Sequence, residues 1–402
     1  MLRIAIITER ADIALGGAER SVSDLAWALF SLGLDVHILA AKGNANSSKL
    51  HILCKDAPGK RTSYYTFANA LKNHLADHDY DIIHSVLPFD FADVYQPRGG
   101  AYAEAALRNA ASYRQRLVRC FKTLTCLANL RRSTLLRAER KLCRGAAGPT
   151  VAALSNYVGE QFNRHYRTPP ERITVIPNGV RTDRPIDHQR AQRLRLQILS
   201  KLGVREANNP VLFLFVAHNF RLKGLHCLIQ ATALAIRTNP DRPIYLVIAG
   251  DGRPRPYVTV GSTHGISNRL VFLGAVNNVP DLLSITNVAV LPTFYDPSSR
   301  FILEALAAGK PVITTRYNGA ADLFTNNRHG IVLDEPNDIA ALAKAMTHFS
   351  NPANIEKASQ AILEDNLAQR ISINRAAGQL VGLYESLLSK KGSHKCTHTS
   401  HC

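Results

Sequence analysis

The sequence predicts an α/β protein built from two Rossmann-like domains, and three observations lead to that fold class. Short apolar segments of strand length alternate with longer segments of helical period, as expected of βαβ units with parallel strands. A chain of 402 residues is long for one domain and comfortable for two. Pro177, Asn178 and Gly179 punctuate the chain as a domain boundary would. We therefore expect a first domain at 1–182, a second at 183–371, a final helix at about 372–388 and a disordered tail at 389–402.

The first domain opens with a strand, a helix and a second strand. The helix, expected at about 18–32, has an apolar stripe of Val22, Leu25, Ala26 and Leu29. Gly16 and Gly17 before this helix are a weak sign of a nucleotide fold, because a turn that needs positive φ explains them equally well. Strands of this domain are predicted at 4–8, 36–41, 81–86, 91–95 and 151–155.

The second domain opens with a fully apolar strand at 211–217, which is typical of a buried parallel sheet. It ends in a turn that carries Arg221 and Lys223, followed by a helix from about Leu225. Cations in such a turn can neutralise a diphosphate, although Lys223 could also be an ordinary surface lysine. Strands are further predicted at 245–249, 270–274 and 330–333, and helices at 187–207 and 337–349.

The segment 295–315 predicts a strand end, a helix and the next strand. We expect Asp296 to be the N-cap of this helix, Pro297 its first residue and Gly309 its end. The free amides of its first turn would then favour an anion, typically phosphate. Glu304 would lie about 12 Å from Asp296 along the axis, where it could bind a ribose diol. Asp296 could equally be only a cap, and Glu304 only a solvated residue. The first-turn amides that would favour an anion are those of Ser298, Ser299 and Arg300.

The charge of the chain predicts an anionic partner. It has 49 basic and 31 acidic residues, a net charge of +18, which suits nucleic acid, an acidic membrane surface or a phosphorylated glycolipid. Seven cysteines, an odd number, favour reduced thiols in the cytosol. No apolar run reaches the roughly 18 residues of a membrane span, and the N-terminal apolar run is too short for a signal peptide. Any membrane contact is therefore expected to be peripheral.

Most of the excess charge lies in a helical insertion at about 98–146, where cations alternate with leucines. A basic amphipathic segment is typical of a membrane surface element that attracts anionic lipid. Nucleic acid is not expected, because the segment has no recognition motif and almost no aromatic residues for base stacking. A solvated helical hairpin packed on the first domain is the alternative. The predicted membrane-binding residues are Arg114, Arg116, Arg119, Lys122, Arg131, Arg132 and Arg137.

The sequence LEALAAGKPVITT at 303–315 resembles the nucleotide-sugar motif of the family-four retaining glycosyltransferases of the GT-B fold. The resemblance is strongest to the glucosyltransferases of the lipopolysaccharide core. The family has glutamate where this chain has Asp296. The resemblance implies two Rossmann-like domains facing a cleft, with the donor bound mainly by the second, the acceptor by the first, and the final helix crossing back onto the first domain.

The resemblance also implies roles for individual residues. Arg98 stands where many members have His or Asp. His84, at the end of a predicted strand, would either form a hydrogen bond to the donor or acceptor or be a structural histidine. The implied catalytic residues are Asp296, Glu304, Lys223, Arg221 and His84. The implied donor-binding residues are Gly16, Gly17, His218, Phe272, Ser298, Ser299, Arg300 and Phe301.

The expected activity is transfer of a hexose, glucose in the first place, from a nucleoside diphosphate sugar to a lipopolysaccharide-core or similar glycolipid. A UDP-sugar is the expected donor, and no metal and no other cofactor is expected. The enzyme would be cytoplasmic and associated with the inner face of the cytoplasmic membrane. A non-catalytic binder of nucleotide or anionic lipid is the alternative. The tail residues His394, Cys396, His398, His401 and Cys402 could bind a metal, but a disordered terminus explains them better.

Overall fold

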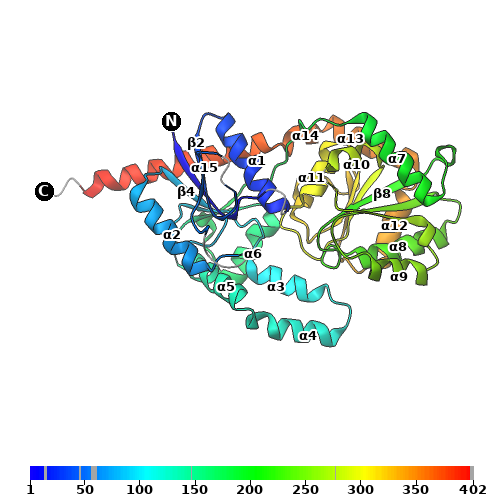
Figure 1. The fold of residues 1–402 in the computed structure, drawn as a ribbon, viewed down its shortest axis with the longest axis horizontal. Coiled ribbons are helices and arrows are strands. Elements are labelled where there is room, and N and C mark those ends of the chain that lie inside the picture. Colours follow the sequence, from blue (N-terminus) through cyan, green and yellow to red (C-terminus); the bar gives the residue numbers. More distant parts are fainter. Residues whose placement is uncertain (13–15, 45–46, 56–60, 146, 277, 399–402) are drawn as a thin grey trace. The chain divides into compact units, whose positions relative to one another are not determined.

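The computed structural model describes residues 1–12, 16–44, 47–55, 61–145, 147–276 and 278–398 (Figure 1). The chain forms two compact units. The first comprises Met1–Leu107, Phe121–Val180 and Ile373–Cys402, and the second comprises Arg108–Cys120 and Arg181–Ser372. The first unit therefore draws on both ends of the chain, and the second draws a short segment from within the basic insertion.

The first unit contains a parallel sheet of seven strands. The strands are β1 Arg3–Arg10, β2 Asp35–Lys42, β3 Leu50–Ile52, β4 Ile82–Ser85, β5 Val94–Tyr95, β6 Thr150–Ala153 and β7 Ile173–Val175. Their order is β3-β2-β1-β4-β5-β6-β7. Ile4 of β1 is in register with Val36 of β2 and Ile82 of β4, and all three side chains are buried. The apolar run at 4–8 thus becomes the centre of the sheet.

The second unit contains a parallel sheet of six strands. The strands are β8 Val211–Val216, β9 Ile244–Ala249, β10 Leu270–Gly274, β11 Val288–Leu291, β12 Val312–Thr315 and β13 Gly330–Leu333, in the order β10-β9-β8-β11-β12-β13. Its central strand β8 is apolar throughout because helices cover both faces of such a sheet. The two parallel sheets, each connected by helices, confirm the predicted pair of Rossmann-like domains.

The helices fall largely where helical periodicity predicts them. Those of the first unit are α1 Gly17–Ser31, α2 Tyr64–Asp77, α5 Leu130–Cys143, α6 Asn156–Tyr166 and α15 Ile373–His398. Those of the second are α7 His188–Leu202, α8 Leu225–Thr238, α9 Arg255–Thr263, α10 Val279–Ile285, α11 Arg300–Ala307, α12 Ile339–His348, α13 Pro352–Glu364 and α14 Leu367–Arg370. Two further helices, α3 Tyr102–Ala111 and α4 Arg116–Leu124, contribute residues to both units.

Helix α15 packs on α1. Ile373, Ala377 and Leu380 of α15 share a buried cluster with Leu25 and Leu29 of α1 (Figure 1). The helix runs to His398, past Leu388, so most of the tail predicted to be disordered is helical. The last four residues, which include His401 and Cys402, lie outside the described residues.

No helix in the described part of the chain is both long and apolar enough to cross a membrane.

Candidate functional site

The turn between β8 and α8 is pressed against the end of β11. Gly224 has a φ of 80°, and a Cβ added there would lie 2.0 Å from the carbonyl oxygen of Pro292. Only glycine permits this approach, because any side chain would clash with backbone. The amide of Phe294 donates a hydrogen bond of 2.9 Å to the carbonyl of Leu222, which fixes the turn. The result is that Lys223 lies beside the residues that follow β11.

Lys223 and Asp296, two of the predicted site residues, are in contact. The Lys223 ammonium donates to Asp296 Oδ2 at 2.6 Å and to the carbonyl of Tyr295 at 2.9 Å. The two side chains are only 19% and 15% exposed, so solvent screens their attraction less than at an open surface. The structure thus places an ammonium and a carboxylate together at the carboxyl end of a parallel sheet, where ligands bind in α/β folds.

The start of α11 differs from the prediction. The N-cap is Ser299, whose hydroxyl accepts from the amide of Ile302, and the helix begins at Arg300 rather than at Pro297. Asp296 instead accepts from the amide of Ser298 at 3.2 Å. The expected N-cap role of Asp296 is therefore wrong, because its carboxylate also binds Lys223 and lies one turn too early.

Two of the three amides that were expected to favour an anion already have hydrogen-bond partners. The amide of Ser299 donates to Asn318 Oδ1 at 3.0 Å, and that of Ser298 donates to Asp296. An anion could bind these two amides only by displacing side-chain oxygens. The buried hydroxyl of Ser298 has no hydrogen-bond partner among the described residues, so it remains a donor for a ligand.

Asn318 is not among the residues predicted above to be catalytic or donor-binding, but it supports the start of α11. Its buried side chain accepts from the amides of Ser299 and Ala320 and donates to Thr314 Oγ1 at 2.9 Å. Asn318 therefore ties the start of α11 to the end of β12. Its position directly before Gly319 is a turn signal, but the partner at Ser299 is not visible in a local pattern.

Glu304 lies one turn into α11 and pairs with Arg300. Arg300 Nη2 donates to Glu304 Oε1 at 3.2 Å, and both side chains are largely shielded from solvent. Glu304 is thus held by its own helix and is not a freely solvated residue. Phe301, also predicted to contact the donor, has its side chain in the core of the second unit.

Three further predicted residues of the second unit, His218, Arg221 and Phe272, have other partners or lie elsewhere in the unit. His218 Nδ1 pairs with Asp251 Oδ1 at 2.8 Å, and both side chains are exposed. Arg221 points to Asn109, whose carbonyl accepts from Nη1 at 3.0 Å, so it is bound by the basic insertion. Phe272 is half-buried on β10. Of the two cations predicted in this turn, Lys223 contacts Asp296, whereas Arg221 contacts Asn109 and Ser112.

In the first unit, the glycine pair lies at the start of α1. Gly16 is the N-cap and Gly17 the first residue of the helix. The first turn carries Glu19, whose Oε1 accepts from Arg10 Nη2 at 2.5 Å. Residues 13–15, which precede the pair, lie outside the described residues.

His84 lies in the interior of the first unit. It is fully buried on β4, and its Nδ1 lies 2.5 Å from the hydroxyl of Tyr384 on α15. Burial, reinforced by the charge of Arg98, lowers the pKa of His84 to about 3, so the imidazole is neutral at physiological pH. These contacts match the structural alternative considered for this histidine.

Arg98, which follows strand β5, forms hydrogen bonds that connect several segments of the first unit. Its Nη1 donates to Ser21 Oγ at 2.9 Å and to Asn178 Oδ1 at 3.1 Å. Asn178 in turn accepts at its carbonyl from Arg375 Nη2, at 3.0 Å. Arg98 thus links α1, the loop after β7 and, through Asn178, α15.

Two family models match the chain, one to each domain. The model described as "Glycosyltransferase Family 4" matches residues 15–184, and the one described as "Glycosyl transferases group 1" matches residues 210–351. The two matched segments are separate and together cover more than half of the chain.

Two curated relatives illustrate the likeness. The lipopolysaccharide glucosyltransferase WaaG of Escherichia coli K12 is 26% identical over 69% of this chain and 69% of its own length. A D-inositol 3-phosphate glycosyltransferase of Corynebacterium urealyticum is 32% identical over 43% of this chain and 42% of its own.

Solved structures share the fold. The crystal structure of WaaG superimposes with a TM-score of 0.74 over 95% of this chain and 99% of its own, at 19% identity. Anabaena Alr3699/HepE in complex with UDP and glucose gives a TM-score of 0.66 over 96% and 100%, at 18% identity. With both domains matched in sequence and fold, this chain belongs to the glycosyltransferases of the GT-B fold.

Proposed function

We propose that this glycosyltransferase moves a hexose, glucose in the first place, from a UDP-sugar to a lipopolysaccharide-core or similar glycolipid, with retention at the anomeric carbon. One observation carries the proposal: Lys223 and Asp296 lie 2.6 Å apart at the end of a parallel sheet, just before the helix that carries Glu304. The similarity to WaaG supports the class of acceptor.

Each residue of this group has a role in the proposal. Lys223 stabilises the charge that grows on the leaving diphosphate, Asp296 binds hydroxyls of the donor sugar, and Glu304 binds the ribose. The Lys223 ammonium has three N–H groups and donates to two protein acceptors, so the third N–H can donate to a phosphate oxygen. The Ser298 hydroxyl adds an uncharged donor at the same place.

The proposed step is a front-face displacement. The bond between the anomeric carbon and the diphosphate oxygen breaks while the acceptor oxygen bonds to the same face of that carbon. The acceptor proton passes to the departing phosphate oxygen. No side chain need act as the base, so the protein contributes positioning and electrostatic stabilisation. A UDP donor is supported by the UDP complexes of the structural relative HepE.

The acceptor would be met at the inner face of the cytoplasmic membrane, and α4 supports this placement. Leu117, Phe121 and Leu124 lie at i, i+4 and i+7 on one face of α4 and are 85%, 60% and 79% exposed. The same helix carries Arg116, Arg119 and Lys122. An exposed apolar face flanked by cations is typical of a helix that lies in a membrane interface with anionic lipid.

The test of the activity is release of nucleoside diphosphate from a panel of UDP-, ADP- and GDP-sugars, with and without deacylated lipopolysaccharide core. We expect acceptor-dependent release from one donor and near-complete loss of release in Glu304→Ala. Glu364→Ala, an exposed glutamate of α13, is the matched control. Unchanged turnover in Glu304→Ala would refute the assigned site, and nucleotide binding without any release would favour the non-catalytic binder.

The membrane placement has its own test. Co-sedimentation with anionic and neutral vesicles should show binding to the anionic vesicles only, and the double variant Leu117→Ser, Phe121→Ser should abolish it. Equal binding by the variant and the parent chain would exclude α4 as the membrane contact.

A further inference from the structure

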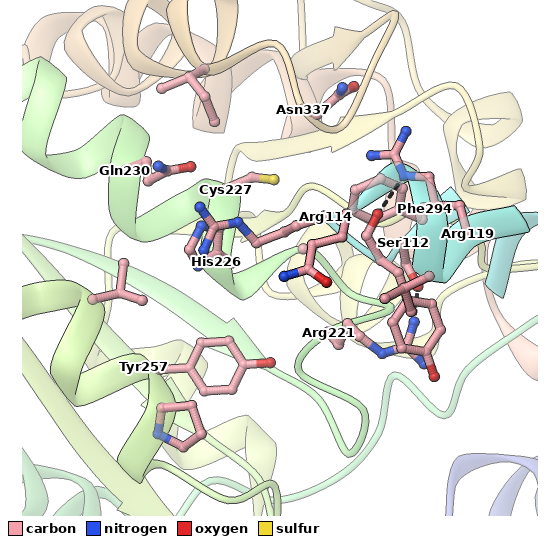
Figure 2. A pocket seen from close by; sticks show the side chains of 17 residues that line it. Ser112, Arg114, Arg119, Arg221, His226, Cys227, Gln230, Tyr257, Phe294 and Asn337 are labelled. Carbon is pink, nitrogen blue, oxygen red and sulfur yellow. Dashed lines mark hydrogen bonds between the residues drawn. The ribbon is translucent and has the colours of Figure 1, made fainter. Parts of the chain in front are cut away.

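A cavity of about 790 Å³ lies in the second unit beside α8 (Figure 2). One wall is the turn before α4 together with its first residues, and the opposite walls are the start of α8 and helix α9. The cavity adjoins the Lys223 turn at Gly224 and Phe294, but neither Asp296 nor Glu304 lines it. Its volume suits a ligand of the size of a substituted sugar.

The charge of the lining is positive. Three arginines, Arg114, Arg119 and Arg221, line the cavity, and none of the described residues that line it is an aspartate or glutamate. Several cations facing one cavity without carboxylates repel each other, and an anion between them relieves that repulsion. The lining therefore favours an anionic occupant.

The wall formed by the insertion is held in place by Arg221. Arg221 Nη2 donates to Asn109 Oδ1 at 2.9 Å, a second bond reaches the Asn109 carbonyl, and a third reaches the Ser112 hydroxyl. The guanidinium also lies 3.8 Å from the centroid of the Tyr113 ring. These contacts fix the turn at 109–113, which directly precedes Arg114, so the cavity is built before any ligand arrives.

Arg114 is available to a ligand. In the described part of the chain its guanidinium has no hydrogen-bond or ion-pair partner, and Figure 2 shows it directed towards His226. His226 Nε2 is shielded from solvent and likewise has no partner there. Burial, with a smaller effect from the Arg114 charge, lowers the pKa of His226, so the imidazole is neutral and can donate one hydrogen bond.

The apolar part of the lining suits a sugar ring. Tyr257 directs its ring and hydroxyl into the cavity in Figure 2, and Phe294 and Val118 line it as well. Val118 lines the cavity, whereas Leu117 and Phe121 of the same helix are exposed and do not line it. The cavity and the exposed apolar face of α4 can therefore be occupied at the same time.

We propose that this cavity binds a phosphate ester of a sugar, with Arg114 and His226 as the groups that contact the phosphate and Tyr257 beside the sugar ring. Arg is suited to this ligand because its planar donors match phosphate oxygens. That the phosphate belongs to the glycolipid acceptor rests on the proposed function, whereas the affinity for a sugar phosphate does not.

The test is calorimetric titration of the full chain at low ionic strength with glucose 6-phosphate, inorganic phosphate and glucose. The expected result is binding of glucose 6-phosphate, weaker binding of inorganic phosphate and none of glucose. Arg114→Gln should weaken glucose 6-phosphate binding roughly tenfold or more, whereas Arg116→Gln, which changes the next arginine along the chain at the start of α4, should leave it unchanged. The proposal is overturned if the two variants bind glucose 6-phosphate with equal affinity, which is the result expected when the probe binds only at Lys223. It is also overturned if neither phosphate compound binds.

The source of the phosphate is tested by transfer to deacylated core with and without its phosphates. Arg114→Gln should raise the KM for the phosphorylated core and leave that for the dephosphorylated core unchanged. If no transfer occurs but the affinity for glucose 6-phosphate depends on Arg114, the proposed function is refuted. The proposal that the cavity binds a sugar phosphate then still stands. If Arg114→Gln has the same KM as the parent chain for both cores, the proposed function stands, but the phosphate of the glycolipid is not the ligand of the cavity.

Discussion

Helices α4 and α5 follow one another in the basic insertion and are both rich in arginine and leucine, but they are built into the protein differently. Helix α4 has no buried residue. Helix α5 buries five, namely Ser133, Leu135, Glu139, Leu142 and Cys143. In α5, Arg131 Nη2 pairs with Glu9 Oε2 at 2.6 Å, whereas the leucines of α4 face solvent. A basic amphipathic composition is therefore found both in a helix that packs against the core and in a helix that stays on the surface. Only the tertiary contacts distinguish the two.

The largest effect is expected at Glu139, the buried carboxylate of α5. It accepts from the Tyr95 hydroxyl at 2.7 Å, from the Tyr102 amide at 2.7 Å and from the Tyr166 hydroxyl. Glu139→Ala leaves three buried donors without an acceptor and should lower the free energy of unfolding by about 3 to 5 kcal/mol in urea titration. Lys122→Ala on α4 should change it by less than about 0.5 kcal/mol. Similar losses in both variants would remove the distinction between the helices.

The leucines give the next largest contrast. Leu135 is buried and Leu117 is 85% exposed. Leu135→Ala should cost about 2 to 4 kcal/mol of stability, because it leaves a cavity in the core, and Leu117→Ala should cost almost nothing. Vesicle binding should show the opposite order, with a loss only in Leu117→Ala. A loss of vesicle binding in Leu135→Ala at a temperature where it remains folded would contradict the assignment of α4 as the membrane helix.

The pH dependence of stability sharpens the comparison further. Burial raises the pKa of Glu139 to about 7, and the three hydrogen bonds oppose that rise only in part. The folded chain then binds a proton that the unfolded chain releases near pH 4.5, so this stabilisation is complete below about pH 4.5 and is lost as the pH rises to about 7. The stability of the parent chain relative to Glu139→Gln should therefore fall by roughly 2 to 3 kcal/mol across that window.

The control for this pH series is Glu160→Gln, an exposed glutamate on α6. Its stability difference from the parent chain should stay constant between pH 4.5 and 7 in the same urea titrations. A constant difference for Glu139→Gln as well would mean that Glu139 is ionised in the folded chain throughout this range.

The smallest effects are expected when one arginine of each helix is replaced, Arg131 of α5 or Arg116 of α4. Arg131→Gln removes the ion pair with Glu9 and the 2.9 Å hydrogen bond to the Thr62 carbonyl, and should cost about 1 kcal/mol of stability. Arg116→Gln should cost no stability but should weaken binding to anionic vesicles, by about 1 kcal/mol for one cation. Stronger vesicle dependence on Arg131 than on Arg116 would reverse the roles given to the two helices.

The fold could be predicted from the sequence because buried parallel strands are short continuous apolar runs. The run at 211–217 became β8, and the run at 4–8 became the centre of β1. Helices α2, α9, α10, α13 and α14 were not predicted, and α15 extends beyond its predicted end. Tertiary packing, rather than the local pattern alone, determines where these helices begin and end.

The site was predicted only in part, since its contacts join distant segments. The turn chemistry indicated Lys223 and Asp296 separately, and their contact depends on the close approach at Gly224. Asp296 and Ser299 are both favourable caps, so the local sequence did not decide between them. His84 lies at a strand end like a ligand-binding residue, but Tyr384, 300 residues later, covers it.

The packing of α15 on α1 has a consequence for the order in which the protein folds during synthesis. The apolar face of α1 emerges from the ribosome before the second unit, but its partner residues Ile373, Ala377, Leu380 and Tyr384 emerge only after the whole second unit. The second unit, apart from its short segment at 108–120, is continuous in sequence and can complete its core first. The amino-terminal unit is thus the last to reach its native state, and a nascent chain held before residue 373 exposes an apolar surface that a chaperone can recognise.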